Sequence, residues 1–168
     1  MSLYEMSAKE QEYLAQYDIT KFERPSVATD IAIFSIMEEG EHDNYRKLPT
    51  KALKLLLIKR ATYPYKDLWA LPGGFCRPDE DVQETALREL YEETGLTATL
   101  DTSRCASIGY PISSFSRKEV VFYLGKVAGI PKVREGEIDK YKWVTAEELK
   151  DYLFPDTFAA CKELLRQV

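Results

Sequence analysis

The feature that most constrains this fold is a helix with well-marked ends at residues 82–94. Asp81 and Glu84 fit a capping box, in which each side chain accepts a hydrogen bond from the other residue's backbone N–H. Gly95 suits the left-handed conformation that commonly ends a helix. One side of the helix is apolar, and it should bury against a sheet. That side comprises Val82, Ala86, Leu87 and Leu90.

The rest of the chain alternates between strand-like and helix-like segments. Runs of β-branched and aliphatic residues predict strands at 26–36, 51–60, 98–109, 118–127 and 139–144. Capping patterns and apolar spacing predict further helices at 8–16, 146–152 and 155–166. The charged segment 38–50 is expected to be a long hairpin loop. This mixture predicts an α/β (α+β) fold, with a mixed sheet sandwiched between α-helices, in a single domain over residues 1–168.

Three glutamates gather on one side of the helix 82–94. At ~100° per residue, Glu89, Glu92 and Glu93 fall within roughly 100° of arc. They repel one another and lie near the negative C-terminal end of the helix dipole. A bound divalent cation offsets both effects, and carboxylate oxygens suit Mg²⁺ or Mn²⁺. The pattern therefore favours a metal site over the alternative, a solvated acidic face. Gly73 and Gly74 follow a proline and are expected to form a loop whose backbone can approach metal or phosphate closely.

The segment around this helix resembles a known family motif. From Gly74 to Leu96 the sequence reads GFCRPDEDVQETALRELYEETGL. It resembles the Nudix box, G-x5-E-x7-R-E-U-x-E-E-x-G-U with U aliphatic, and it fills every specified position. The preceding WALPGG and the later WVTAEEL are also typical of the family. The resemblance implies the Nudix fold and a Mg²⁺-dependent hydrolase, in which Mn²⁺ can substitute. Such an enzyme cleaves the diphosphate linkage of a nucleoside diphosphate joined to another group.

The resemblance also implies roles for the residues of the box. Glu92 and Glu93 are the expected primary metal ligands. Glu89 is a further ligand or a base, and the Gly74 backbone is expected beside the metal. Arg88 is expected to orient a catalytic glutamate.

Three roles stay open between a catalytic and a plainer interpretation. Arg88 could instead form a helix-surface ion pair with Glu84 or Glu92, both of which it can reach by i,i+4 spacing. Glu80 could act in catalysis or simply place a charge at the helix N-terminus. In the family the base can also lie on a later loop. The best candidate there is Glu137, with Glu135 second, and either could be a solvated loop residue.

Two substrate classes remain open. The segments RPSVATDIAIF and IKRATYPYKDLWALPGGFCRPDE resemble Nudix proteins that handle ADP-ribose. Pro111 sits where such members often carry a proline, although Ile112 replaces the glycine that often follows. ADP-ribose or an ADP-sugar is therefore the preferred substrate. The carboxyl-terminal pattern looks more like dinucleoside polyphosphate hydrolases, so a dinucleoside polyphosphate or a nucleoside triphosphate is the rival.

Substrate contacts are expected from basic and aromatic side chains. The candidates are Arg60, Arg77, Tyr110, Pro111 and Phe115. Tyr63, Tyr65 and Phe75 could also stack on a base, although such residues are more often part of a core or rim.

Composition excludes several classes of partner. The net charge is -5 and no run of basic residues exists, so a nucleic acid polymer is not expected to bind. No apolar run approaches the ~20 residues of a membrane span. The chain holds one histidine, which excludes a histidine-rich zinc site. The three cysteines form no CxxC pair, which predicts a reducing, cytoplasmic setting. A homodimer is left open.

A second function class also has to be considered. Some ADP-ribose-responsive repressors use a Nudix domain as a non-catalytic sensor, followed by a DNA-binding domain and often with a degraded box. Here the box is intact and the charge balance is acidic, so we expect an enzyme that acts on a small nucleotide.

Overall fold

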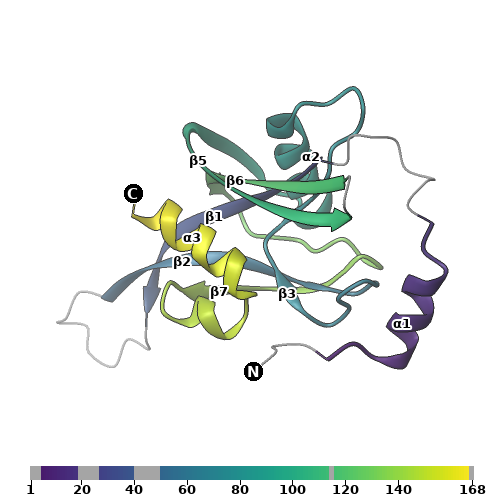
Figure 1. Cartoon of the computed structure of the whole chain (residues 1–168). Helices are drawn as coiled ribbons and strands as arrows, with labels where there is room; N and C mark the ends of the chain where they lie inside the picture. The colour runs from purple at the N-terminus through teal and green to yellow at the C-terminus, as the bar shows by residue number, and fades with distance from the viewer. Residues whose placement is uncertain (1–4, 19–26, 40–49, 114–115, 167–168) are drawn as a thin grey trace.

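The computed structural model describes residues 5–18, 27–39, 50–113 and 116–166, and these contain a seven-stranded sheet with helices around it (Figure 1). The long strands are β1 (Val27–Glu39), β2 (Thr50–Arg60), β5 (Thr97–Ser113), β6 (Ser116–Ala128) and β7 (Ile138–Thr145). Two short strands are β3 (Trp69–Ala70) and β4 (Gly73–Phe75). The helices are α1 (Ala8–Ala15), α2 (Val82–Thr94) and α3 (Pro155–Leu165), with a 3₁₀ turn, η2 (Glu148–Asp151).

The sheet is mixed, as the sequence predicts. β1 runs parallel to β6 and antiparallel to β2 and β4. β2 also pairs antiparallel with β3 and β7, and β5 pairs antiparallel with β6. β4 is thereby held beside β1, directly before the chain enters α2.

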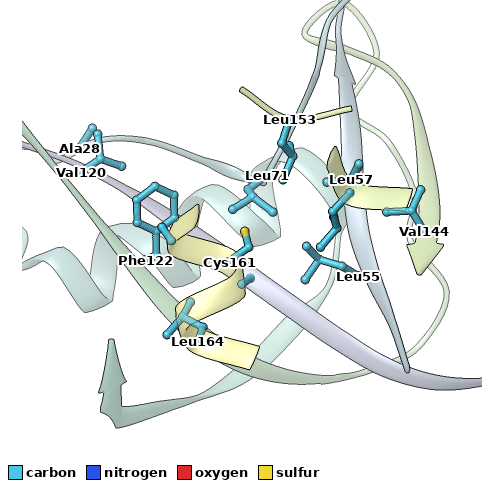
Figure 2. Close-up of a cluster of buried hydrophobic side chains, with 13 residues drawn as sticks. Ala28, Leu55, Leu57, Leu71, Val120, Phe122, Val144, Leu153, Cys161 and Leu164 are labelled. Atoms are coloured by element: carbon cyan, nitrogen blue, oxygen red, sulfur yellow. The ribbon is translucent and has the colours of Figure 1, made fainter. Parts of the chain in front are cut away.

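Strand alternation divides the core into two layers. Leu55 and Leu57 on β2 pack with Leu164 and Cys161 of α3 on one face of the sheet, where Figure 2 shows them. Leu56, between them in sequence, packs with Ala86 and Leu90 of α2 on the other face. The prediction of a sheet sandwiched between helices is confirmed. No helix in the described part of the chain has the length and apolar character needed to span a membrane.

The two short strands were not predicted. Gly73 and Gly74, expected in a loop, belong to β4, where Gly74 pairs with Thr29 and Gly73 with Asp30 of β1. Glycine is depleted in strands and β4 is too short to show alternation, so the sequence carries no strand signal here. The pairing is close: a Cβ added at Gly73 would lie 2.7 Å from the Asp30 Cα. Close backbone approach does explain the glycine at position 73, but its close neighbour is the β1 backbone.

Two local predictions about helices were wrong. The helix expected at 146–152 is only the turn η2. The Glu148 carboxylate accepts a hydrogen bond from the Thr145 backbone N–H, as a capping box requires. The Thr145 hydroxyl also donates to that carboxylate, at 2.9 Å, instead of accepting from the Glu148 N–H. Leu87, expected to be buried, is 36% exposed. It lies at the edge of the arc whose centre holds Ala86 and Leu90.

Strands β1 and β2 extend into both ends of the predicted loop 38–50. Glu38 and Glu39 pair with Lys51 and Thr50 in the β1–β2 hairpin. Residues 40–49 lie outside the described residues.

Candidate active site

The helix α2 begins and ends where its capping residues predict. The Asp81 carboxylate accepts hydrogen bonds from the backbone N–H groups of Gln83 and Glu84, each at 2.8 Å. The Glu84 carboxylate accepts from the Asp81 N–H at 3.1 Å and completes the capping box. Gly95 ends the helix with a φ of 66°. Both ends are therefore fixed by local hydrogen bonds, which sets the direction in which the acidic side chains project.

Glu93 is the buried carboxylate of the site. It is 3% exposed and accepts a hydrogen bond from the Gly73 N–H at 2.9 Å. Burial raises the pKa of Glu93 to about 8, the charges of Glu89 and Glu137 add to this rise, and the Gly73 hydrogen bond and the Arg60 charge oppose it. A carboxylate in these surroundings is stabilised by an added positive charge.

Glu89 lies beside Glu93 and against β4. A Cβ added at Gly74 would lie 2.5 Å from the Glu89 carboxylate, so glycine at this position leaves room for that group. Burial raises the pKa of Glu89, while its ion pair with Arg88 acts in the opposite direction. The predicted neighbours Gly74, Glu89 and Glu93 therefore do come together.

Arg88 connects α2 to the segment that precedes it. Its Nε and Nη2 atoms donate to the two Glu80 carboxylate oxygens at 2.6 and 2.8 Å. Its Nη1 donates to Glu89 at 2.6 Å, and its Nη2 also donates to the Phe75 carbonyl oxygen at 3.2 Å. The hydrogen bond from Arg88 is the main reason that the pKa of Glu80 falls to about 2. The Arg88 side chain is only 16% exposed. Of the two i,i+4 partners that its spacing allows, it reaches Glu92 at 3.4 Å, whereas Glu84 caps the helix.

Glu92, an expected primary ligand together with Glu93, is surrounded by arginines. Arg77 Nη2, Arg88 Nη1 and Arg134 Nη1 lie 3.4, 3.4 and 3.6 Å from its carboxylate oxygens. Within the described residues, no three acidic, histidine or cysteine side chains already converge as a metal site. Guanidinium groups contact the carboxylates of both Glu89 and Glu92.

A loop between β6 and β7 brings Glu137 to the cluster. The Arg134 N–H donates to the Glu93 carbonyl oxygen at 3.1 Å, and the Ala61 N–H donates to the Glu137 carbonyl oxygen at 2.9 Å. The Glu137 carboxylate pairs with Arg134 at 3.2 Å and its charge acts on both Glu89 and Glu93. Glu135, the second candidate for a base, is exposed and makes none of these contacts.

Arg134 was missed by the sequence analysis. It lies three residues before Glu137, and that spacing within a charged loop was its only signal.

The remaining predicted substrate contacts divide into two groups. Arg77 lies beside Glu80 and Glu92, and Arg60 faces Glu93 while its Nε donates to the Pro64 carbonyl oxygen at 3.0 Å. The side chains of Tyr110 and Pro111 lie outside the described residues, although their backbone forms part of β5. Phe115 lies outside the described residues altogether.

A small pocket of about 90 Å³ opens elsewhere, on the α3 side of the sheet. It contains none of the predicted site residues. Its lining consists of Leu68, Trp69, Asp151, Tyr152 and Phe154.

The fold and the site together define a mixed α/β domain. A helix on one face of its sheet carries acidic side chains that pair with arginines. The chain belongs to the Nudix family, because the model of the NUDIX domain matches residues 39–165. Members of this family generally use divalent metal ions.

Two curated relatives match part of the chain. The ADPR responsive transcriptional repressor NtrR of Acinetobacter baylyi is 38% identical over 111 residues, which cover 65% of this chain and 39% of the repressor. A putative 8-oxo-dGTP diphosphatase of Bacillus subtilis is 36% identical over 105 residues, 61% of this chain and 65% of that protein. The chain therefore spans less than two thirds of either relative.

A solved structure shows the same fold. The Ap4A hydrolase of C. elegans, in a binary complex, has a TM-score of 0.68 and 19% sequence identity. The match covers 85% of this chain and 97% of the hydrolase.

Proposed function

We propose that this chain is a divalent-cation-dependent hydrolase that cleaves the diphosphate linkage of a nucleoside diphosphate joined to another group. The observation that carries the proposal is the buried Glu93 carboxylate, placed beside Glu89 and within the field of Glu137. Negative charges gathered away from solvent repel one another, and a bound cation offsets that repulsion. Phosphoryl chemistry requires this kind of positioned charge more than it requires a covalent nucleophile.

The residues present fit Mg²⁺ or Mn²⁺. Glu89, Glu92 and Glu93 offer oxygen donors only, and Gly74 leaves space at Glu89. These four residues would hold the ion, with Gly74 contributing through its backbone. When bound, the cation neutralises charge on the diphosphate and lowers the pKa of a coordinated water.

The other residues of the cluster position groups and hold protons. Arg88 donates hydrogen bonds of 2.6–2.8 Å to both Glu80 and Glu89. These bonds position the Glu89 carboxylate. Glu137 reaches the cluster from a different segment and is our candidate for the base that accepts a proton from the attacking water. Glu89 is the alternative base.

The preferred substrate is ADP-ribose or an ADP-sugar. The flanking segments and Pro111 support this choice, as does the relative described as ADPR responsive. The similarity to a putative 8-oxo-dGTP diphosphatase supports the rival, a nucleoside triphosphate. A dinucleoside polyphosphate is the third class to be tested.

The test is a substrate panel with Mg²⁺, containing ADP-ribose, diadenosine tetraphosphate and the common nucleoside triphosphates. We expect ADP-ribose to give the highest kcat/KM, with AMP and ribose 5-phosphate as products, and EDTA to abolish turnover. A kcat/KM for ADP-ribose tenfold or more below another substrate, about 1.4 kcal/mol of transition-state preference, contradicts the substrate choice. Full activity in EDTA contradicts the metal-dependent mechanism.

A second candidate function is ADP-ribose sensing without catalysis, which the similarity to the repressor favours. Tight ADP-ribose binding in Mg²⁺, with no product after prolonged incubation of the wild-type chain, would support the sensor over the enzyme.

Arg77 and Arg134 are expected to bind phosphate oxygens once a cation occupies Glu92. Both side chains are more than half exposed and both contact Glu92. Arg77→Ala and Arg134→Ala should raise KM about threefold to tenfold, because a charged hydrogen bond to phosphate is lost. The same changes should tighten Mn²⁺ binding about twofold to fivefold, because a competing guanidinium is removed.

Arg104→Ala is the matched control, since Arg104 pairs with Asp101 on β5. Mn²⁺ titration calorimetry without substrate and steady-state kinetics measure the two effects separately. Unchanged KM in both variants would argue against phosphate contacts by these arginines.

A further inference from the structure

The helix α1 is attached to the body of the protein by a carboxylate. Glu10 is 1% exposed and accepts a hydrogen bond from the Tyr65 N–H at 2.7 Å. The larger apolar side chains of this segment stay exposed, among them Leu14 at 38%. One directional hydrogen bond to a buried group fixes the helix at a defined place on the loop 61–68. Figure 1 shows α1 (purple) beyond the ends of the strands, at the edge of the sheet.

Three tyrosines form a continuous aromatic surface where α1 meets this loop. The ring centroids of Tyr13 and Tyr63 are 6.1 Å apart with 31° between the planes. Those of Tyr13 and Tyr17 are 6.0 Å apart with 38° between the planes. Tyr13 and Tyr17 are 38% and 40% exposed. We call Tyr13, Tyr17 and Tyr63 the tyrosine platform. Tyr63 is half-buried. Aromatic rings gathered from two segments, two of them exposed, are typical of a binding surface.

The platform is connected to the acidic site through the start of the loop 61–68. Tyr63 follows Arg60 by three residues, so its Cα is within about 11 Å of the Arg60 Cα. Arg60 acts electrostatically on Glu93 and its Nε also bonds the Pro64 carbonyl oxygen, within the same loop. Ala61 bonds Glu137 at 2.9 Å. The start of this loop therefore links Tyr63 to the backbone of Glu137, whose charge acts on Glu89 and Glu93.

We propose that the tyrosine platform binds the nucleobase of a nucleoside diphosphate-linked substrate while the diphosphate lies at Glu89, Glu92 and Glu93. This inference rests on the proposed function and gives the nucleobase a binding place of its own, apart from that of the diphosphate. A tyrosine ring offers a planar face on which a base stacks, and stacking accepts any base. The Lys66 ammonium lies over the Tyr63 ring, 5.9 Å from its centroid, and places a positive charge at the platform.

The test compares two ligands that differ only in the base. AMP and ribose 5-phosphate are titrated calorimetrically into the whole chain in the presence of Mg²⁺. The wild type should bind AMP at least tenfold more tightly than ribose 5-phosphate. Tyr13→Leu and Tyr63→Leu should each weaken AMP binding roughly fivefold to tenfold and leave ribose 5-phosphate unchanged. Tyr91→Leu is the matched control, because Tyr91 is a 60% exposed tyrosine on α2.

A further variant keeps all three rings and removes their support. Glu10→Ala breaks the bond to Tyr65, so α1 should detach and AMP binding should weaken while ribose 5-phosphate binding does not. Melting temperatures identify a variant that has failed to fold, and the other variants then decide the outcome.

The outcomes separate the platform from the proposed function. The platform is overturned if the wild type binds both ligands equally, or if the tyrosine variants weaken both ligands equally. Retained AMP affinity in Glu10→Ala would also overturn it. If no diphosphate is hydrolysed but the AMP preference is present and is lost in the tyrosine variants, the hydrolase proposal fails and the platform stands.

Discussion

Glu93→Gln is expected to lower kcat for the preferred substrate at least about 100-fold, because a metal ligand at the centre of the charge network is lost. The fold should survive the change. A glutamine oxygen can still accept the Gly73 hydrogen bond, which is 2.9 Å long. The variant also removes a buried carboxylate from the field of Glu89 and Glu137, so without metal it should melt at or above the temperature of the wild type.

Glu84→Gln provides the matched control for this prediction. It makes the same chemical change on the same helix, and glutamine can keep the capping-box hydrogen bond to Asp81. Its kcat should stay within about twofold of the wild type. Steady-state kinetics with Mg²⁺ and thermal unfolding in EDTA measure the two effects. A Glu93→Gln enzyme with wild-type kcat would show that Glu93 is not required, and a collapse of the fold would show that its charge is structural.

The local parts of the site could be predicted from the sequence. The caps of α2 depend on residues three apart, so Asp81, Glu84 and Gly95 determine both ends of the helix by themselves. The helical repeat then places Glu89 and Glu93 on one side of α2. These relations need no knowledge of the tertiary structure.

The contacts that depend on tertiary structure could not be predicted. The spacing of Arg88 allowed a bond with Glu84 or Glu92, and the Glu92 contact forms at 3.4 Å. Glu84 is used in the cap instead, and the bond from Arg88 to Glu80 was not predicted. Arg134 approaches Glu92 only because a distant loop hydrogen-bonds to the end of α2. Such pairings arise between segments far apart in sequence, where spacing gives no information.

The short strand β4 shows the same limit. Its two glycines are read locally as a loop, whereas Gly73 lets β4 approach β1 and Gly74 leaves room for the Glu89 carboxylate. The sequence did indicate close approach at Gly73 and Gly74, but it named metal or phosphate as the partner. The structure adds a second partner, the β1 backbone.

Gly73→Ala should therefore be among the most destabilising single substitutions in this chain. A Cβ at this position would lie 2.7 Å from the Asp30 Cα and closer still to the Thr29 carbonyl oxygen. Both obstacles are backbone atoms of β1, so no side-chain rotation relieves the overlap. We expect the free energy of unfolding to fall by about 3 kcal/mol or more, with a melting temperature lower by roughly 6–12 °C. Activity should fall as well, because the Gly73 N–H that bonds Glu93 must move.

Gly136→Ala separates overlap from backbone conformation. Gly136 has a φ of 90°, and no atom lies within 4 Å of a Cβ added there. Alanine at this position adds backbone strain without overlap and should cost about 1–2 kcal/mol. Urea unfolding of the two variants and the wild type, without substrate, gives the comparison. If Gly73→Ala is no less stable than Gly136→Ala, then β4 can move away from β1 at little cost, and close strand approach does not explain the glycine.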